Sequence, residues 1–372
     1  MYPALAVLEA LKNDDRRQTM DERQPLSVVS GLLWVGGIGG MEEQLVKQAG
    51  VPFEAIPAAG VHGVGARALP GNIGQLWLGL MKARRVLRSF RPDVLLFTGG
   101  FVAVPVALAA RLPGRGFPRP RSLLYIPDIE PGLALKSLAR FADRIAVTTR
   151  DTRAYLGGHS SMIVTGYPTR SGLRAWNKEQ ALAVLGLSAK PPILFVFGGS
   201  KGARSINQAL WAALPELLSE LQIVHITGQL DWPEVEKVRA QLSEEFAERY
   251  HPYPFLHQEM GAAFTVADLA LCRAGASTLG ELPLFGLPAV LVPYPHAWRY
   301  QQVNAQYLAD HGAAVILEDA ELSRQLLPVV RDLIGNIHKR EQMHSAMRAL
   351  AQPDAAAKIA EHLHSLSAEP RR

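Results

Sequence analysis

Short runs of consecutive apolar residues alternate along this chain with longer segments in which apolar residues recur every three or four positions. A short continuous run is typical of a strand buried on both faces, and the longer period predicts a helix with one buried face. Strands that alternate with helices indicate parallel sheets with crossover helices, so we expect an α/β fold. The predicted strands are 27–34, 94–97, 122–126, 144–147, 162–165, 193–197, 222–227, 269–272, 289–292 and 314–316, and the predicted helices include 41–48, 76–88 and 302–310.

Two breaks in this pattern divide the chain. Residues 166–172 have the sequence Gly-Tyr-Pro-Thr-Arg-Ser-Gly, which is typical of an interdomain hinge. A second polar break, at 351–354, precedes a final helical segment. We therefore expect one domain at 1–165, a second at 166–352, and a C-terminal helix within 353–372 that packs back on the first domain.

The chain opens on a helical segment in which Pro3 occupies a typical first-turn position. A doubly wound domain normally begins with a strand and a phosphate-facing turn before this helix. We therefore expect the first strand of the sheet and its turn to be missing from the sequence as given. An open strand position of this kind should destabilise the domain.

Composition narrows the class of protein. Apolar residues make up 48% of the chain and charged residues 20%, which fits a well-cored α/β protein. The single cysteine, Cys272, excludes an internal disulfide framework and a cysteine-only metal site, and agrees with a reducing cytoplasm. No apolar run is long enough to span a membrane, and the N-terminus does not resemble a signal peptide. We expect a cytoplasmic protein without a metal or a tightly bound cofactor.

Positive charge is concentrated in one region. Between Arg67 and Arg121 the net charge is +9, although the whole chain carries only +5. Within this region apolar and aromatic residues stand beside cations, a pattern that suits an anionic membrane surface but is also that of an ordinary amphipathic helix. The segment lacks the interleaved aromatics of a nucleic-acid site. The candidate membrane patch consists of Leu76, Trp77, Leu80, Met81, Lys82, Arg84 and Arg85.

A small-residue turn between an apolar strand and a helix occurs twice in the second half, at 197–204 and at 270–281. Such a turn brings backbone N–H groups and a helix N-terminus close to an anion. The carboxylate of Glu281, within the second helix, suits the vicinal diol of a ribose better than a phosphate. The two turns together predict a site for a nucleotide diphosphate.

Several blocks, in order, cover nearly the whole chain and resemble the MurG family of N-acetylglucosaminyltransferases. One glycine-rich turn alone would be weak support, but the ordered set is specific. The blocks are Pro3-Ala4-Leu5-Ala6, Thr98-Gly99-Gly100-Phe101-Val102, Gly166-Tyr167-Pro168-Thr169-Arg170, Gly198-Gly199-Ser200-Lys201-Gly202-Ala203, Cys272-Arg273-Ala274-Gly275-Ala276 through Glu281, and His296 to Ala305.

The resemblance implies a GT-B architecture, with two Rossmann-like, doubly wound parallel-sheet domains facing a cleft. It also implies inverting transfer of N-acetylglucosamine from UDP-N-acetylglucosamine to the polyprenyl-diphosphate-linked muramyl-pentapeptide (lipid I to lipid II) in peptidoglycan synthesis, at the cytoplasmic face of the membrane. The implied roles are diphosphate contact for Gly199 and Ser200 with Arg170 nearby, the second turn for Ala276 and Thr278, ribose for Glu281, the sugar for Gln301, uracil for Leu256, and the acceptor side for Thr98, Gly99 and Gly100.

The chain departs from the family on the acceptor side. The family's Gly-Gly-Thr-Gly-Gly-His loop, whose histidine is the usual proposed base, is absent before Met1, and the simplest hypothesis is a start site placed too late or a truncated sequence. The family's His-Glu-Gln-Asn stretch is here Tyr125-Ile126-Pro127-Asp128. Asp128 is a weak candidate for a substitute base and His296 another, although either could be structural. Arg273 could bind phosphate or form a salt bridge.

These departures leave alternatives open. The chain could transfer a sugar from a UDP-sugar to another lipid, such as diacylglycerol, or it could bind nucleotide sugars without catalysis. A dehydrogenase is disfavoured because no Gly-x-Gly-x-x-Gly opens a strand–helix unit with the acidic follower. Acceptor identity, the base and the oligomeric state do not follow from the sequence.

Overall fold

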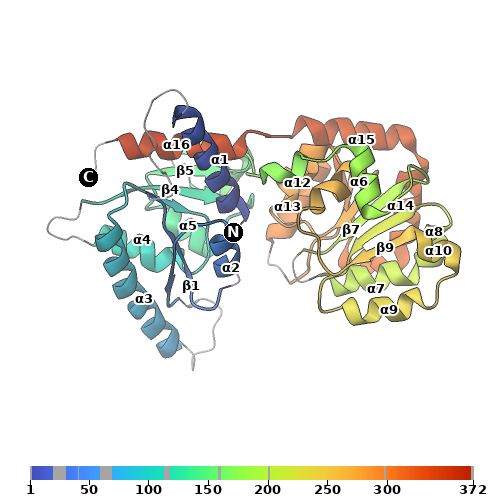
Figure 1. Cartoon of the computed structure of the whole chain (residues 1–372), viewed down its shortest axis with the longest axis horizontal. Coiled ribbons are helices and arrows are strands. Elements are labelled where there is room, and N and C mark those ends of the chain that lie inside the picture. Colours follow the sequence, from blue (N-terminus) through green and yellow to red (C-terminus); the bar gives the residue numbers. More distant parts are fainter. Residues whose placement is uncertain are drawn as a thin grey trace. The chain divides into compact units, whose positions relative to one another are not determined.

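The computed structural model describes residues 2–19, 31–40, 42–58, 69–112, 118–157, 161–199, 202–296 and 299–369. The chain forms two compact α/β units (Figure 1). Unit 1 comprises Met1–Arg170 together with Asp354–Arg372, and unit 2 comprises Ser171–Pro353. The division after Arg170 lies inside the predicted hinge.

Unit 1 contains two parallel sheets, one of β1 and β2 and the other in the order β3-β4-β5-β6. Val35 and Ile56 from the smaller sheet share a core with Phe97, Leu124 and Ile145 from the larger one. The strands are β1 Trp34–Gly37, β2 Phe53–Ile56, β3 Val94–Phe97, β4 Arg121–Ile126, β5 Arg144–Val147 and β6 Met162–Val164; the helices are α1 Tyr2–Thr19, α2 Glu42–Gln48, α3 Leu69–Phe90, α4 Ala103–Arg111, α5 Leu133–Ala139, the 3₁₀ helix η2 Arg150–Tyr155, and α16 Ala355–Ala368.

Among the described residues, β1 and β3 are not paired with each other. The doubly wound order 3-2-1-4-5-6 places one further strand between the strands that correspond to β1 and β3. The sheet of unit 1 is therefore divided at the position that the first strand of such a domain occupies.

Unit 2 contains one six-stranded parallel sheet in the order β12-β11-β10-β7-β8-β9. This is the doubly wound order 3-2-1-4-5-6 when its strands are counted from β7. The strands are β7 Ile193–Phe197, β8 Gln222–Ile226, β9 Tyr250–Tyr253, β10 Leu269–Cys272, β11 Ala289–Leu291 and β12 Ala314–Ile316; the helices are α6 Lys178–Leu185, α7 Arg204–Ala212, α8 Leu214–Leu218, α9 Trp232–Arg239, α10 Glu244–Arg249, α11 Met260–Val266, α12 Thr278–Phe285, α13 Tyr300–Asp310, α14 Leu322–Gly335 and α15 Ile337–Ala349, with 3₁₀ helices η3 Ser171–Arg174 and η4 Asp319–Glu321.

Nine of the ten predicted strands are observed within one residue at each end. The exception is 27–34, because the strand begins at Trp34 and runs to Gly37, while residues 27–30 lie outside the described part of the chain. β2 and β9 were not predicted. Both are four-residue strands at sheet edges, and β9 contains Pro252, which weakens the strand signal.

The last helix, α16, belongs to unit 1, where it packs against α1, β3 and β4. Ion pairs join Glu369, just beyond α16, to Arg121 and Arg144 at the start of β4 and β5. The final segment of the chain therefore completes the unit with which the chain begins (Figure 1).

Candidate active site

The strand order of unit 2 identifies its ligand-binding edge. β7 lies at the point where the order changes direction, with β8 on one side and β10 on the other. In doubly wound sheets the ligand binds outside the carboxyl ends of the two strands at this point. Phe197 and Cys272, the last residues of β7 and β10, are register partners, so the two predicted turns leave the sheet side by side.

The turn after β7 is built from glycines in left-handed conformations. Gly199 is exposed, has φ 91°, and its carbonyl accepts a hydrogen bond from the Gly202 N–H at 3.0 Å. Gly202 has φ 78°, and a Cβ on it would lie 2.4 Å from the carbonyl oxygen of Thr227. The turn thus packs directly on the end of β8 and leads into the N-terminus of α7. Ser200, predicted to contact the diphosphate, lies outside the described residues.

The turn after β10 leads into α12. The hydroxyl of Thr278 donates to the carbonyl of Gly275 at 2.7 Å, and its side chain is buried. The side chain of Thr278 therefore stabilises the turn. The group that this turn can offer to a ligand is the N-terminus of α12. Ala276, at this turn, is partly exposed.

Glu281 lies in the first turn of α12 and is partly exposed. Burial, and then the negative charge of Glu281, raise the pKa of the Cys272 thiol. This electrostatic effect places the carboxylate near the carboxyl end of β10, at the predicted ligand edge. Cys272 itself is fully buried, as expected for a small core residue.

Gln301 lies in the first turn of α13. Its Oε1 accepts a hydrogen bond from the backbone N–H of Tyr294 at 2.8 Å, which leaves the amide NH₂ as the group that it can donate to a ligand. His296 is exposed, and its ring packs edge-on against Tyr294, with the centroids 5.4 Å apart.

Arg273 is buried and forms a partly buried salt bridge. Its guanidinium donates to Asp319 Oδ1 at 2.5 Å and to Ser205 Oγ at 2.7 Å, and also to the carbonyls of Val292 and Pro293. Ser205 lies in the first turn of α7, so this cluster ties the helix that follows the first turn to the strand that precedes the second. The structural role is the one observed for Arg273.

Two further predicted donor residues lie apart from the turns in sequence. Leu256, in the segment that follows β9, is buried. Arg170 falls in unit 1, whereas the sequence placed it in the second domain, and its guanidinium lies 4.8 Å from the centre of the Tyr2 ring. Their roles toward a nucleotide stay predictions.

On the predicted acceptor side, Thr98, Gly99 and Gly100 follow β3 and precede α4. Gly99 and Gly100 have φ values of 103° and 83°, so two consecutive left-handed residues make a tight turn at the carboxyl edge of the sheet. This edge of unit 1 corresponds to the ligand-binding edge of unit 2.

A buried hydrogen-bond network lies at the end of β4, where the resemblance implies the polar stretch His-Glu-Gln-Asn. The hydroxyl of Tyr125 lies 2.9 Å from Thr148 Oγ1, and the Thr148 hydroxyl donates to the carbonyl of Pro127 at 2.7 Å. Burial raises the pKa of Tyr125, and the charge of Asp128 raises it further. Asp128 therefore lies near this network on a partly buried loop.

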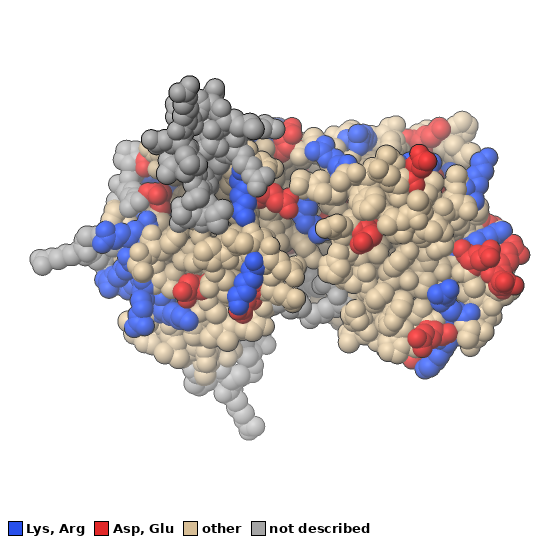
Figure 2. Space-filling model, in the orientation of Figure 1, with Lys and Arg blue, Asp and Glu red and all other residues tan. Residues whose placement is uncertain are grey.

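The candidate membrane patch lies on α3. Trp77, Leu78 and Met81 are exposed, next to the exposed Lys82 and Arg85. Leu76 and Arg84 are partly buried, while Leu80 packs on the core. Basic side chains also gather over the end of unit 1 that carries α3 and α4 (Figure 2). In the described part of the chain, no helix is both long and apolar enough to cross a bilayer.

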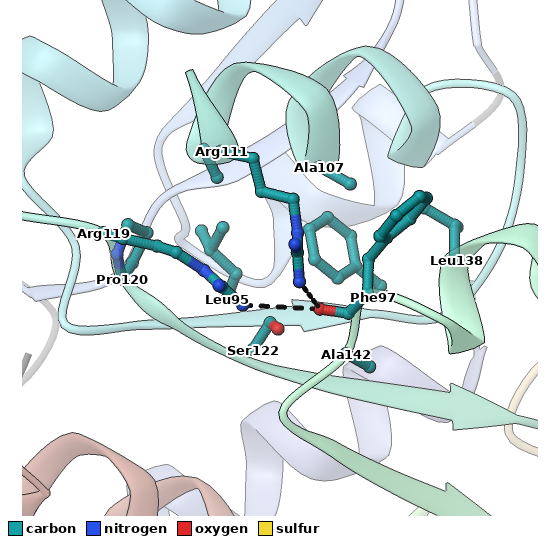
Figure 3. Close-up of a pocket in the computed structure, with 11 residues that line it drawn as sticks. Leu95, Phe97, Ala107, Arg111, Arg119, Pro120, Ser122, Leu138 and Ala142 are labelled. Carbon is teal, nitrogen blue, oxygen red and sulfur yellow. Dashed lines mark hydrogen bonds between the residues drawn. The ribbon is translucent and has the colours of Figure 1, made fainter. Parts of the chain in front are cut away.

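Unit 1 also contains a small cavity, beside the start of β3 and β4 and away from the carboxyl edge of their sheet (Figure 3). Arg111 donates to the carbonyl of Phe141 at 2.6 Å across it. Burial and the charge of Arg119 lower the pKa of Arg111. The cavity has a volume of about 20 Å³, which suits a single water molecule, so it is not a substrate site. The described ranges contain no group of three or more His, Cys, Asp or Glu side chains placed to hold a metal ion.

The site residues that the sequence did not indicate form hydrogen-bond clusters behind the first turn. They are Ser205 and Asp319, which hold Arg273, and Asn207 on α7 with its partners His225 and Asp231. These residues are far apart in the chain and belong to no motif, so only the fold brings them together.

The comparisons with known proteins agree with this geometry. Residues 1–147 match the glycosyltransferase family 28 N-terminal domain, and residues 193–362 match the family 28 C-terminal domain. A UDP-N-acetylglucosamine–N-acetylmuramyl-(pentapeptide) pyrophosphoryl-undecaprenol N-acetylglucosamine transferase from Roseiflexus sp. is 40% identical, over 98% of this chain and 92% of that protein. The protein of the same name from Chlorobaculum parvum is 35% identical, over 99% of this chain and 96% of its own length.

Solved structures show the same fold. MurG from Acinetobacter baumannii matches with a TM-score of 0.68 and 26% identity, over 98% of this chain and 95% of that one. A UDP-GlcNAc 2-epimerase from Neisseria meningitidis matches with a TM-score of 0.65 but only 12% identity, over 98% of this chain and 97% of that one, and shows the fold alone. The two α/β units are thus a GT-B fold, as predicted. The chain belongs to glycosyltransferase family 28, and within it to the MurG enzymes.

Proposed function

We infer that this protein transfers N-acetylglucosamine from UDP-N-acetylglucosamine to the muramyl-pentapeptide carried on a polyprenyl diphosphate, a step of peptidoglycan synthesis. The observation that carries this inference is the full-length similarity, at 33–40% identity, to transferases named for that reaction. The two adjacent turns at the carboxyl ends of β7 and β10 support it independently, because doubly wound sheets bind nucleotides at such a position.

We propose that the two turns bind the donor. The N–H groups at Gly199 and Ser200 and the N-termini of α7 and α12 stabilise the negative charge that develops on the departing UDP. Glu281 accepts hydrogen bonds from the ribose hydroxyls, and the Gln301 amide donates to the sugar. Ala276 and Thr278 shape the second turn, Leu256 lines the uracil, and Arg170 adds positive charge.

We propose that unit 1 binds the acceptor, with the turn at Thr98, Gly99 and Gly100 facing its diphosphate. Inversion at the anomeric carbon requires a base that takes the proton from the acceptor hydroxyl. Asp128 is the candidate on this chain, because its carboxylate lies on the loop after β4 at the same edge of the sheet.

We also propose that the exposed face of α3 rests on the cytoplasmic surface of the membrane. Trp77 and Met81 would enter the interface, and Lys82 and Arg85 would pair with anionic head groups. A lipid-linked acceptor stays in the membrane. A protein bound to the membrane surface therefore needs to find this substrate only within the plane of the membrane.

The experiment that tests the transferase function measures transfer of labelled N-acetylglucosamine by the purified protein. Acceptors are polyprenyl-diphosphate-linked muramyl-pentapeptide and, in a parallel reaction, diacylglycerol. Transfer to the muramyl acceptor alone supports the proposal, and transfer to diacylglycerol alone contradicts it. Binding of UDP-N-acetylglucosamine without transfer to either acceptor would identify a non-catalytic binding protein.

A further inference from the structure

A network of buried hydrogen bonds in unit 2 joins α7 to the neighbouring strands β8 and β9, close to the first donor turn. At its centre lies His225 on β8, which is fully buried. Its Nδ1 lies 2.9 Å from the hydroxyl of Tyr250, and its Nε2 lies 3.0 Å from Oδ1 of Asn207. None of these residues belongs to the motifs that identify the family in the sequence.

The direction of every bond in this network can be assigned. Nδ2 of Asn207 lies 2.8 Å from the carbonyl of Thr227 and 2.8 Å from Oδ2 of Asp231, which are both acceptors. Nδ2 must therefore be the donating amide, and Oδ1 of Asn207 must accept. The Nε2 of His225 consequently carries the hydrogen.

The hydrogen bonds at the Tyr250 end of this network are consistent with a neutral imidazole ring at His225. Nε1–H of Trp211 donates to the Tyr250 hydroxyl at 2.9 Å, so this hydroxyl gives its own hydrogen to Nδ1 of His225. A second hydrogen on the ring would point at the hydroxyl and displace that bond. Burial also lowers the pKa of His225, to about 3.

The hydrogen-bond network reaches the start of α7. Asn207 is the fourth residue of this helix, and Arg204, its first residue, donates to Oδ1 of Asp231 at 3.1 Å. Thr227, whose carbonyl accepts from Asn207, is the residue on which Gly202 packs. Asn207 thus holds together the helix, the end of β8 and the glycine turn between them.

We propose that His225 is a positioning residue for donor binding: as the Nε2–H tautomer it orients Asn207, which sets Gly202 and the N-terminus of α7 for the donor diphosphate. The inference rests on the proposed function, because it assigns a cause to the geometry of that donor site. His225 itself touches no substrate.

The test compares two variants at this position. In His225→Gln the amide NH₂ can replace Nε2–H as the donor to Asn207, whereas His225→Leu removes the donor. UDP affinity is measured by calorimetry, which needs no acceptor. Loss of one oriented hydrogen bond predicts about tenfold weaker UDP binding for His225→Leu and a change of less than about threefold for His225→Gln.

Tyr250→Phe separates positioning from stability. This variant removes the bonds of the tyrosine hydroxyl to Trp211 and His225 but leaves the bond from Nε2–H to Asn207. We expect a lower midpoint of urea unfolding with unchanged UDP affinity. A fall in affinity that followed stability across Tyr250→Phe, His225→Gln and His225→Leu would overturn the proposal, because a purely structural role predicts that correlation.

The tautomer is measured directly. In protein labelled with ¹⁵N-histidine, the resonance absent from His225→Gln identifies His225, and its two ring nitrogens distinguish the tautomers. A hydrogen on Nε2 alone supports the proposal, and a hydrogen on Nδ1 contradicts it. Wild-type protein that bound no UDP would refute the donor site itself, whereas wild-type binding with equal affinity in both His225 variants would refute only this inference.

Discussion

The donor site depends on a few side chains at the carboxyl ends of β7 and β10. Sequence reasoning predicted the strand, the small-residue turn and the helix start at each of these two places, because all three are local features. It did not find the side-chain clusters around Arg273 and Asn207, because their partners lie 18 to 68 residues away and meet only in the folded sheet. The salt bridge of Arg273 was one of two open alternatives.

Replacing Glu281 by Ala should weaken binding of UDP-N-acetylglucosamine by roughly 1–3 kcal/mol, because the ribose hydroxyls lose a charged acceptor. Titration calorimetry measures this difference. Glu236→Ala is a matched control, since Glu236 is an exposed acid in the middle of α9. Equal affinities for Glu281→Ala and the wild type would remove Glu281 from the ribose site.

The buried imidazole of His225 should make stability depend on pH. Its pKa in the folded protein is about 3, against roughly 6.5 for an unfolded histidine. Between these values the unfolded chain binds a proton that the folded protein does not, so the free energy of unfolding falls with decreasing pH, by about 1.4 kcal/mol per pH unit.

Urea unfolding of the wild type and of His225→Gln, compared between about pH 6 and about pH 4, isolates this contribution. The wild-type stability should fall more steeply. His251, whose pKa burial also lowers, is present in both proteins and cancels in the comparison. Parallel pH profiles would show that His225 does not resist protonation.

At the scale of elements, burial decided which predictions succeeded. β7 and β10, at the centre of the sheet of unit 2, are fully buried and have continuous apolar sequences, and they were predicted within one residue. β1 was misplaced because it includes Gly36 and Gly37, which weaken a strand pattern. The helical period of α3 was recognised, but its start at Leu69 was not.

Helix α3 has one buried side and one exposed side, and the sequence alone did not show which apolar residues lie on which side. Gly79, Ala83 and Leu87 are buried, and Gly79 approaches the backbone of Pro57, so this side packs on unit 1. Trp77, Leu78 and Met81 remain exposed beside Lys82 and Arg85. The apolar residues beside the cations are thus not all required by the core.

Reversing two charges on this face, Lys82→Glu with Arg85→Glu, should reduce binding to vesicles that contain anionic lipid, by about 1 kcal/mol for each cation removed from the surface. Cosedimentation measures the bound fraction. The control is Lys237→Glu with Arg239→Glu on α9, which makes the same change in net charge on unit 2. Equal binding by both double variants would show that only net charge matters and that α3 is not the contact surface.

At the scale of the whole molecule, the two units differ in the continuity of their sheets. Unit 2 has six strands hydrogen-bonded in one sheet, whereas the sheet of unit 1 is divided between β1 and β3 among the described residues. We therefore expect unit 1 to be the less stable of the two.

Differential scanning calorimetry should show two transitions, with unit 1 unfolding at the lower temperature. UDP should raise only the upper transition if the proposed donor site in unit 2 binds it; at 100 times its dissociation constant the added stability is about 2.7 kcal/mol. A lower transition that responds to UDP would reverse the assignment.

The return of α16 to unit 1 affects the order in which the protein can fold on the ribosome. Domains usually fold in the order of their synthesis, beginning with the N-terminal one. Here unit 1 lacks the helix that packs on α1, β3 and β4 until residues 354–372 have been made, whereas every residue of unit 2 is already present. The unit that is started first is therefore finished last, and the nascent chain carries a complete unit 2 before unit 1 can close its core.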